Sequence, residues 1–419
     1  MNRIERMVAE MCPDGVEYWA LDAVFLLRNG YTPAKSNGEF WCSNEVPWFR
    51  MEDIRANGHI LYEAIQGVST SAIKGNLFPA DSVLIATSAT VGEHALIRVP
   101  HMSNQRFTNL SLRREFVGRL DMEFFNYYAF ILDKWCLEHV NVSSFASVDM
   151  KALRKTLIPV PPIEIQRKIV DILDSFTRLE AELEAELEAR RTQYAFYRDR
   201  LLSFDFEAGG GGAVLQGISL SNVAWVPMGE VGTLKRGRRF TANDFRDEGL
   251  AAIHYGEIYT RYGVVAREVG TRVSPNLGEL RFAEPGDIII ACVGETVEDI
   301  GRGVAWLGSE SVAYHDDSVA WRSDHEPRYL SHFLRSRAFD SQKRKFVSSG
   351  KVKRIAPAAL SQISVPIPPL EVQRRIADVL DDFDALVNDL SSGLPAEIAA
   401  RRQQYEYYRD RLLTFPEKK

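Results

Sequence analysis

A stretch running from residue 159 to residue 204 is repeated near the C-terminus of this 419-residue chain. Residues 161–176 align with residues 368–383 with 10 identities among 16 positions, and residues 190–204 align with residues 401–415 with 11 among 15. The offset between the copies is 207 residues in the first block and 211 in the second, so the second copy is four residues longer between the blocks. A repeat of this length indicates a duplicated domain and not a solenoid.

Each copy is predicted to form a long helix. Two prolines begin each copy, and proline is tolerated in the first turn of a helix. Apolar residues then recur at spacings of three and four, which is typical of a coiled-coil seam. The seam includes Tyr194, Tyr197, Tyr405 and Tyr408, which we assign to packing and not to base stacking. Such a helix spans roughly 60 Å, so we expect the two helices to form an antiparallel pair; the alternative is a solvent-facing connector helix.

The second copy contains the segment S-S-G-L-P-A-E, with Gly393 and Pro395 inside the seam. Proline inside a helix removes a hydrogen bond and clashes with the preceding turn. The C-terminal helix is therefore predicted to be kinked or broken near residue 393, where the four extra residues also lie.

The two regions between the repeats share one order of patterns. The buried-strand pattern P-G-D-I-I-I-A of the second region corresponds to P-A-D-S-V-L-I-A of the first. Likewise, H-D-D-S-V-A-W of the second region occupies the place of N-Q-R-F-T-N-L in the first. Scaffold positions match while loop residues differ, which predicts one fold built twice to present two surfaces. The expected class is α+β: two α/β domains joined by two long helices that form an antiparallel coiled coil, with the C-terminus near the N-terminus. The predicted segments are a domain over 1–157, a helix over 158–206, a glycine-rich linker over 207–220, a domain over 221–363 and a helix over 364–419.

Composition limits the setting in which such a chain works. Hydrophobic residues make up 45% and charged residues 26%, as in soluble globular proteins. No apolar run approaches the roughly 18 residues of a membrane span. The four cysteines lie far apart without a CxxC motif, which favours a reducing cytoplasm and argues against a zinc site. The net charge of −6 leaves nucleic-acid binding open, because charge can be segregated by domain.

Catalytic signatures are absent from the sequence. It contains no GxxxxGK[ST], no GxGxxG after a strand, no GxSxG, no HExxH and no N/D-P-P-F/Y tetrapeptide. His315, Asp316 and Asp317 form the nearest thing to a cluster, and we interpret them as a loop whose acids hydrogen-bond locally. We therefore expect no catalytic residue, no bound metal and no enzymatic activity in this chain.

The lysine and arginine residues indicate where the chain could contact DNA. Lysine and arginine clusters near serine, glycine and amide side chains provide what phosphate contact needs. Asparagine and glutamine can pair with adenine edges, and arginine with guanine. The candidate DNA-binding residues are Asn104, Gln105, Arg106, Lys235, Arg236, Arg238, Arg239, Lys343, Arg344, Lys345, Lys351, Lys353 and Arg354.

The layout resembles the DNA-specificity subunit of type I restriction–modification systems. The most specific elements are I-P-V-P-P-I-E-I-Q-R and V-P-I-P-P-L-E-V-Q-R, each of which closes a variable region and opens a helix. The L-E-A-E tract from Leu179 to Arg190 and the strand P-G-D-I-I-I-A add to the likeness. The resemblance covers nearly the whole chain.

The resemblance implies two target-recognition domains that each read one half of a split site in double-stranded DNA. It implies two modification subunits, which would carry S-adenosylmethionine and methylate adenine, and restriction subunits, which would carry ATP and Mg for translocation and cleavage. No cofactor is then expected in this chain. Two alternatives stay open: a non-enzymatic coiled-coil scaffold whose heads bind protein, and the specificity subunit of a related defence system without restriction.

Overall fold

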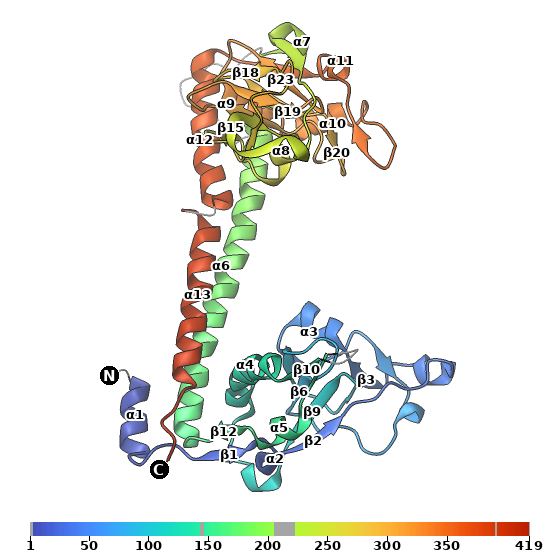
Figure 1. Ribbon diagram of the computed structural model, residues 1–419, viewed down its shortest axis with the longest axis vertical. Coiled ribbons are helices and arrows are strands. Elements are labelled where there is room, and N and C mark those ends of the chain that lie inside the picture. Colours follow the sequence, from blue (N-terminus) through green and yellow to red (C-terminus); the bar gives the residue numbers. More distant parts are fainter. Residues whose placement is uncertain (1–2, 143–145, 205–222, 390–391, 419) are drawn as a thin grey trace. The chain divides into compact units, whose positions relative to one another are not determined.

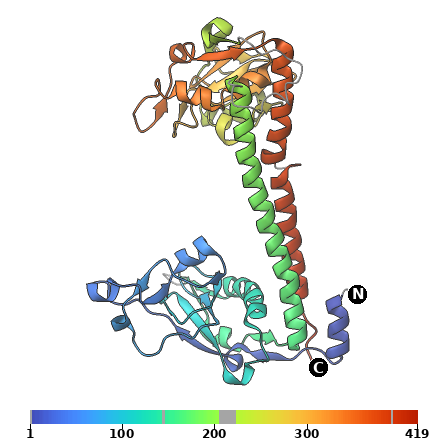
Figure 2. The same cartoon turned by 180° about the vertical axis from the view of Figure 1, so that it is seen from behind.

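The computed structural model describes residues 3–142, 146–204, 223–389 and 392–418. The predicted glycine-rich linker over 207–220 lies outside the described residues. The chain forms two compact units, the first made of residues 1–181 with 400–419 and the second of residues 182–399. Both units appear in Figure 1 and, from behind, in Figure 2. None of the described helices is long and apolar enough to cross a membrane.

The first unit is built on a five-stranded sheet in the order β2-β9-β6-β7-β4. Its central strand, β6, is buried along its whole length, which suits its apolar sequence S-V-L-I-A. The pairs are antiparallel except β4 with β7. The strands are β2 (Phe25–Asn29), β4 (Ile60–Leu61), β6 (Ser82–Ala86), β7 (His94–Ile97) and β9 (Phe107–Leu112).

Smaller elements complete this unit. A three-stranded sheet has the order β5-β3-β8, and the pairs β1–β12 and β10–β11 are two-stranded. The strands are β1 (Tyr18–Ala20), β3 (Val46–Phe49), β5 (Gly67–Val68), β8 (Met102–Ser103), β10 (Val140–Val142), β11 (Ala146–Val148) and β12 (Leu157–Pro159). The helices are α1 (Arg3–Met11), α2 (Leu21–Val24), α3 (Met51–Asn57), α4 (Met122–Glu138) and α5 (Met150–Lys155), with 3-10 turns at Gly38–Trp41, Thr70–Ala72 and Arg114–Phe116.

The second unit repeats the plan with a five-stranded sheet in the order β14-β23-β19-β21-β16. A four-stranded sheet, β17-β15-β22-β18, and the pairs β13–β25 and β20–β24 accompany it. The strands are β13 (Ala224–Pro227), β14 (Thr233–Arg236), β15 (Phe245–Ile253), β16 (Val265–Ala266), β17 (Thr271–Val273), β18 (Phe282–Ala283), β19 (Ile288–Ala291), β20 (Val293–Gly294), β21 (Gly303–Trp306), β22 (Val312–Tyr314), β23 (Ser318–Arg322), β24 (Lys353–Arg354) and β25 (Ser364–Ile367). Its short helices are α7 (Met228–Val231), α8 (Glu257–Thr260), α9 (Pro327–Phe333), α10 (Arg337–Lys343) and α11 (Pro357–Leu360), with a 3-10 turn at Ala242–Asp244.

Each unit contains part of a pair of long helices, as Figure 1 shows. They are α6 (Ile163–Ser203), α12 (Leu370–Asn388) and α13 (Leu394–Leu412). In the first unit, the ring of Phe176 lies 6.4 Å from that of Tyr405 and 5.8 Å from that of Tyr408, and Arg402 pairs with Glu180. A residue later in α6, Glu180, contacts a residue earlier in α13, Arg402, so the two helices are antiparallel. In the second unit, Tyr197 of α6 stacks on Phe383 of α12 at 5.7 Å. The assignment of the seam aromatics to packing is confirmed.

The repeated glutamine near each helix start has the same structural role in both copies. Gln166 and Gln373 are fully buried. The Nε2 of Gln166 donates to the carbonyl oxygens of Pro161 and Arg119, at 2.6 and 2.7 Å, and its Oε1 accepts from the N–H of Asp121, the N-cap of α4. Gln373 donates to Pro368 at 2.7 Å and accepts from the N–H of Glu326, the N-cap of α9. Each glutamine therefore fastens its long helix to the first turn of a helix in the same unit.

The predicted interruption near residue 393 is present. Helix α12 ends at Asn388 and α13 begins at Leu394. Gly393 approaches the preceding helix so closely that a Cβ there would lie 2.5 Å from the carbonyl oxygen of Ala385. Pro395 falls in the first turn of α13, where a missing N–H is tolerated.

Both described ends of the chain lie together in the first unit. The N–H of Val16 donates to Pro416 O at 2.8 Å, and the N–H of Lys418 donates to Val16 O at 2.9 Å. Arg411 of α13 also pairs with Glu5 of α1 at 2.7 Å. The expected approach of the C-terminus to the N-terminus is confirmed.

Candidate nucleic-acid interface

One edge of each five-stranded sheet carries the loops in which the two halves of the sequence differ. We call this edge the variable edge. In the first unit it comprises the ends of β2 and β6 and the turn at 104–106 that enters β9. In the second unit it comprises the ends of β14 and β19 and the turn at 315–317 that enters β23.

Strand register makes the two turns equivalent residue by residue. Ala86, the last residue of β6, pairs with Phe107, the first residue of β9. Ala291, the last residue of β19, pairs with Ser318, the first residue of β23. Residues 104–106 therefore correspond to residues 315–317. By the same reasoning, Asn29 at the end of β2 corresponds to Arg236 at the end of β14.

The same hydrogen bonds close both turns. In the first, the N–H of Arg106 donates to Asn104 Oδ1 at 3.0 Å, and the N–H of Thr87 donates to Arg106 O at 2.9 Å. In the second, the N–H of Asp317 donates to His315 Nδ1 at 3.0 Å, and the N–H of Cys292 donates to Asp317 O at 2.8 Å. Asn104 and His315 thus perform one structural task, that of accepting the bond that shapes the turn.

The side chains displayed on these matching backbones differ in chemistry. The bridge between Ser88 and Ser147 in the first unit matches the pair Val293–Arg354 in the second. The first edge therefore shows one cation among amides and hydroxyls, whereas the second shows two cations and two acids. The first set is Asn29, Ser88, Gln105, Arg106 and Ser147, and the second is Arg236, Val293, Asp316, Asp317 and Arg354.

The charged groups of the second edge contact one another. Arg236 Nε donates to Asp316 O at 2.6 Å, and its Nη2 lies 4.0 Å from Asp317 Oδ1. Arg354 Nη1 lies 3.4 Å from the same Oδ1. The side chains of Arg236 and Arg354 are 56% and 58% exposed, so their guanidinium groups remain accessible to a ligand. A cavity of about 240 Å³ lies among these residues and is also lined by Cys292, Val293 and the segment 355–357.

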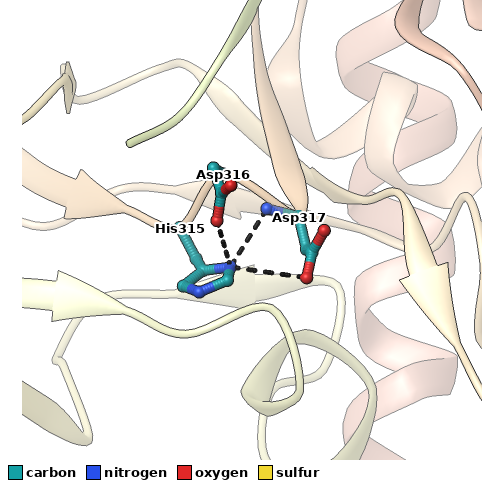
Figure 3. A group of neighbouring side chains, drawn as sticks. All are labelled: His315, Asp316 and Asp317. Carbon is teal, nitrogen blue, oxygen red and sulfur yellow. Dashed lines mark hydrogen bonds and ion pairs between the residues drawn. The ribbon is translucent and has the colours of Figure 1, made fainter. Parts of the chain in front are cut away.

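His315, Asp316 and Asp317 lie close enough together to hold a metal ion, and no other group of described residues does so (Figure 3). The arrangement does not suit a metal. The lone pair of His315 Nδ1 already accepts the N–H of Asp317. Arg236 and Arg354 pair with the neighbouring carboxylates, which are the groups that would supply the negative charge of a metal site. His315 therefore shapes the turn, while the two carboxylates contact Arg236 and Arg354 from other segments of the chain as well as His315. The interpretation as a loop whose acids bond locally holds only in part.

Most of the basic residues predicted for the start of the second domain gather at the variable edge. Lys235, Arg236, Arg238 and Arg239 are all exposed. Arg238 is paired with Glu279 at 3.4 Å, and the partners of Arg236 are given above. Lys235 is on β14, one residue before the edge.

The residues at 351–354 reach the same edge from another part of the chain. Strand β24 pairs with β20, so that Lys353 faces Gly294 and Arg354 faces Val293, two residues beyond the end of β19. Lys351 is exposed on the loop that leads into β24.

The prediction for Lys343 is wrong. Its side chain is 4% exposed, and its Nζ donates to Ile300 O at 2.7 Å and pairs with Asp340 at 3.1 Å. Burial lowers the pKa of this lysine. Its ammonium group points inward and is already bonded to Ile300 O and Asp340, so it is not offered to a phosphate. Arg344 is exposed but engaged with Asp340 at 2.8 Å and Glu298 at 3.0 Å, while Lys345 is exposed.

Asn104 also does not fulfil its prediction as a reader of adenine. Bidentate pairing needs both the oxygen and the nitrogen of the amide, and Asn104 Oδ1 is engaged inside its turn. Gln105 and Arg106 are exposed at the same turn, with the amide oxygen of Gln105 bonded to the Thr32 hydroxyl. Asn29, Asp316 and Asp317 were absent from the predicted set. The alignment of H-D-D with N-Q-R in the sequence is the signal from which Asp316 and Asp317 could have been added to the candidate DNA-binding residues.

A family model for the type I restriction modification DNA specificity domain matches residues 13–189 and 221–400. The chain belongs to this family. A type I restriction enzyme specificity subunit of Escherichia coli, EcoprrI, is 36% identical over 408 residues, which cover 91% of each chain. The EcoR124I/EcoR124II specificity subunit of the same species is 31% identical over 300 residues, covering 65% of this chain and 68% of the relative.

Solved structures agree with this specificity-subunit fold. A chain from a study of complex assembly and conformational transition of the type I restriction–modification system aligns with a TM-score of 0.67 and 18% identity, covering 95% of this chain and 97% of that one. The HsdS subunit of Thermoanaerobacter tengcongensis aligns with a TM-score of 0.53 and 18% identity, covering 96% and 97%. The protein is thus a specificity subunit of a type I restriction–modification system, with a role in DNA sequence recognition. The expected fold class, two α/β domains joined by helices that form an antiparallel coiled coil, is confirmed.

Proposed function

We propose that this specificity subunit reads a bipartite DNA site, with one half read by a domain within residues 1–157 and the other by a domain within residues 221–363. The observation that carries the proposal is the variable edge, which is built twice with the same hydrogen bonds and with different side chains. Two domains with the same scaffold need different side chains at this edge only when each domain binds a different DNA sequence.

The helices have two tasks in this proposal. As a coiled coil they set the number of unread base pairs between the half-sites, and their repeated segments provide docking sites for two modification subunits. Those partners bind S-adenosylmethionine and methylate adenine, and restriction subunits bring ATP, Mg and endonuclease activity. This chain itself binds no cofactor and works in the cytoplasm. The absence of nucleotide-binding and base-holding motifs from its sequence supports a division of labour of this kind.

The test is a selection of duplexes with random sequence by the complex of this chain with the modification subunits of its own system. We expect the recovered DNA to share two short sequences separated by a fixed number of unspecified base pairs. Adenine methylation should map to the same sites in cells. Recovery of DNA without any shared sequence, combined with firm binding of another protein by the two domains, would instead support the scaffold alternative.

A further inference from the structure

The variable edge of the second unit presents a hydrogen-bond pattern that matches one base pair. Asp317 offers carboxylate acceptors, and Arg236 offers guanidinium donors whose Nη2 is 4.0 Å from Asp317 Oδ1. In the major groove, a C·G pair shows the N4–H donor of cytosine next to the O6 acceptor of guanine, about 3 Å away. An acceptor beside a donor on the protein therefore faces a donor beside an acceptor on the DNA.

We propose that Arg236 and Asp317 together read a C·G base pair in the half-site of the second domain, with Arg354 positioning Asp317. This inference rests on the proposed function. Asp317 accepts from cytosine N4, and Arg236 donates to O6 and N7 of the guanine on the other strand. An A·T pair also shows a donor beside an acceptor, but thymine offers arginine one acceptor and a methyl group in place of the two acceptors of guanine.

The surroundings of Asp317 favour contact with a base over contact with phosphate. A carboxylate repels phosphate, so an acid on a DNA-binding edge has to be compensated or directed at a base edge. Here Arg354 lies 3.4 Å from Asp317 Oδ1, and Arg236 also lies beside it, which supplies the compensation. The cavity of about 240 Å³ among these groups leaves room for the edge of a base to approach.

The backbone holds Asp317 in place before DNA arrives. Its N–H is bonded to His315 Nδ1, and its carbonyl oxygen accepts from Cys292, the residue after β19. The N–H of Ile355 then donates to Cys292 O at 3.0 Å, which fixes the neighbouring strand that carries Arg354. Groups that are already ordered lose little conformational entropy on binding, so a contact made by them discriminates efficiently between bases.

The corresponding place in the first unit explains why the two domains would not read the same pair. Arg106 stands where Asp317 stands, and Asn29 stands where Arg236 stands. This pair contains no carboxylate, and the Oδ1 of Asn29 already accepts the hydroxyl of Thr108 at 3.0 Å, so the acceptor that Asp317 offers to cytosine N4 has no equivalent here. The C·G preference is therefore expected in one half-site, at the position read by this pair.

The experiment compares three single variants in the full chain assembled with its modification subunits. Asp317→Asn keeps the shape of the side chain and replaces one acceptor by a donor, and Arg236→Gln removes the bidentate donor. Glu310→Gln is the matched control, because Glu310 is exposed and follows β21 at the opposite edge of the sheet. Each complex selects duplexes in which both half-sites are randomised, and thermal unfolding verifies that each variant is folded.

We expect Asp317→Asn to lower the preference for C·G at one base pair of one half-site by about tenfold or more. Arg236→Gln should lower the preference at the same pair, and the other half-site should be unchanged in both variants. The control should select the same DNA as the wild type. If either variant proves unfolded, the other still tests the pair.

Retention of wild-type preferences by the folded variants, a change at an A·T pair, or a uniform loss of affinity without a change in preference would overturn the inference. Those results leave the proposed function intact, because the wild-type complex would still select a bipartite site. Failure of the wild-type complex to select any sequence would overturn the proposed function itself.

Discussion

Tyr127 donates its hydroxyl proton to Asp174 Oδ1 at 2.6 Å, which joins α4 to α6 in the first unit. His332 Nε2 lies 2.8 Å from Asp381 Oδ1 in the second unit and joins α9 to α12 in the same way. Asp174 and Asp381 are identical positions of the repeat, separated by 207 residues. The repeat therefore preserves the acceptor on the long helix while the donor on the domain changes from phenol to imidazole.

The repeated glutamines should be more important to stability than their exposed neighbours. Gln166→Met removes three hydrogen bonds and leaves buried backbone groups unsatisfied, so we expect a loss of about 2–4 kcal/mol in the free energy of unfolding of the first unit. The variant Glu164→Gln serves as the control, because Glu164 is exposed. Urea denaturation measures both, and equal stability of the two variants would show that Gln166 does not fasten α6 to α4.

Lys343 and Lys345 should respond in opposite ways to substitution. Lys343→Ala removes the ion pair between the buried Lys343 and the partly exposed Asp340, so it should lower the melting temperature and leave the salt dependence of DNA binding unchanged. Lys345→Ala should leave the melting temperature unchanged and reduce the salt slope by roughly 0.9, because this exposed lysine is the one we expect to contact phosphate. Thermal unfolding and DNA titration at several salt concentrations check both. A reduced slope for folded Lys343→Ala would contradict its structural role.

Acid should weaken the first unit through His101. Burial lowers the pKa of this imidazole to about 4, whereas an unfolded histidine titrates near 6.5. Between these values the unfolded chain binds a proton that the folded chain does not, so the contribution is complete above about pH 6.5 and is lost as the pH falls toward 4. The loss amounts to about 3 kcal/mol.

Hydrogen exchange of the β6 and β9 amides across this pH range measures the effect of His101. The variant His101→Gln should show a smaller decline, while exposed His139→Gln should keep the decline of the wild type. The same pH dependence in His101→Gln and the wild type would assign the acid sensitivity to other groups.

The L-E-A-E tract should act as a ruler. One more L-E-A-E after Glu186 lengthens α6 by about 6 Å and turns it by about 40° beyond a full circle. The tract is continuous helix and mostly exposed, so the insertion meets little packing. Both half-site sequences should persist while the spacer between them grows by roughly one to two base pairs.

Genome-wide mapping of methylated adenine measures the spacer of the ruler variant. Insertion of four glycines beside Gly209 is the control and should leave the spacer unchanged. An unchanged spacer in the L-E-A-E variant would mean that the inserted turn bulges out of the helix.

Much of the architecture was predictable because it rests on local rules applied twice. The proline starts, the seam spacing and the Gly393–Pro395 interruption depend on backbone sterics and periodicity, and all three appear in the structure. The alignment of H-D-D with N-Q-R was also predictable, because a buried strand follows each turn. These features need no knowledge of distant contacts.

The candidate site was less predictable because burial and pairing are tertiary. Lys343 sits in a basic run with Arg344 and Lys345, yet its place at the end of α10 turns it inward toward Ile300. Asn104 looks like an adenine reader in the sequence, but its side chain is used by its own turn. Arg354 meets Asp317 only through the pairing of β24 with β20, across 37 positions of sequence.

The bonds that close the two turns have a consequence for how such proteins diversify. At positions 106 and 317 they use only main-chain atoms, so the side chains there can change by single mutations with little effect on folding. Selection for a stable protein then leaves these positions free to drift. Variants at these two positions therefore fold alike while they present different side chains to DNA.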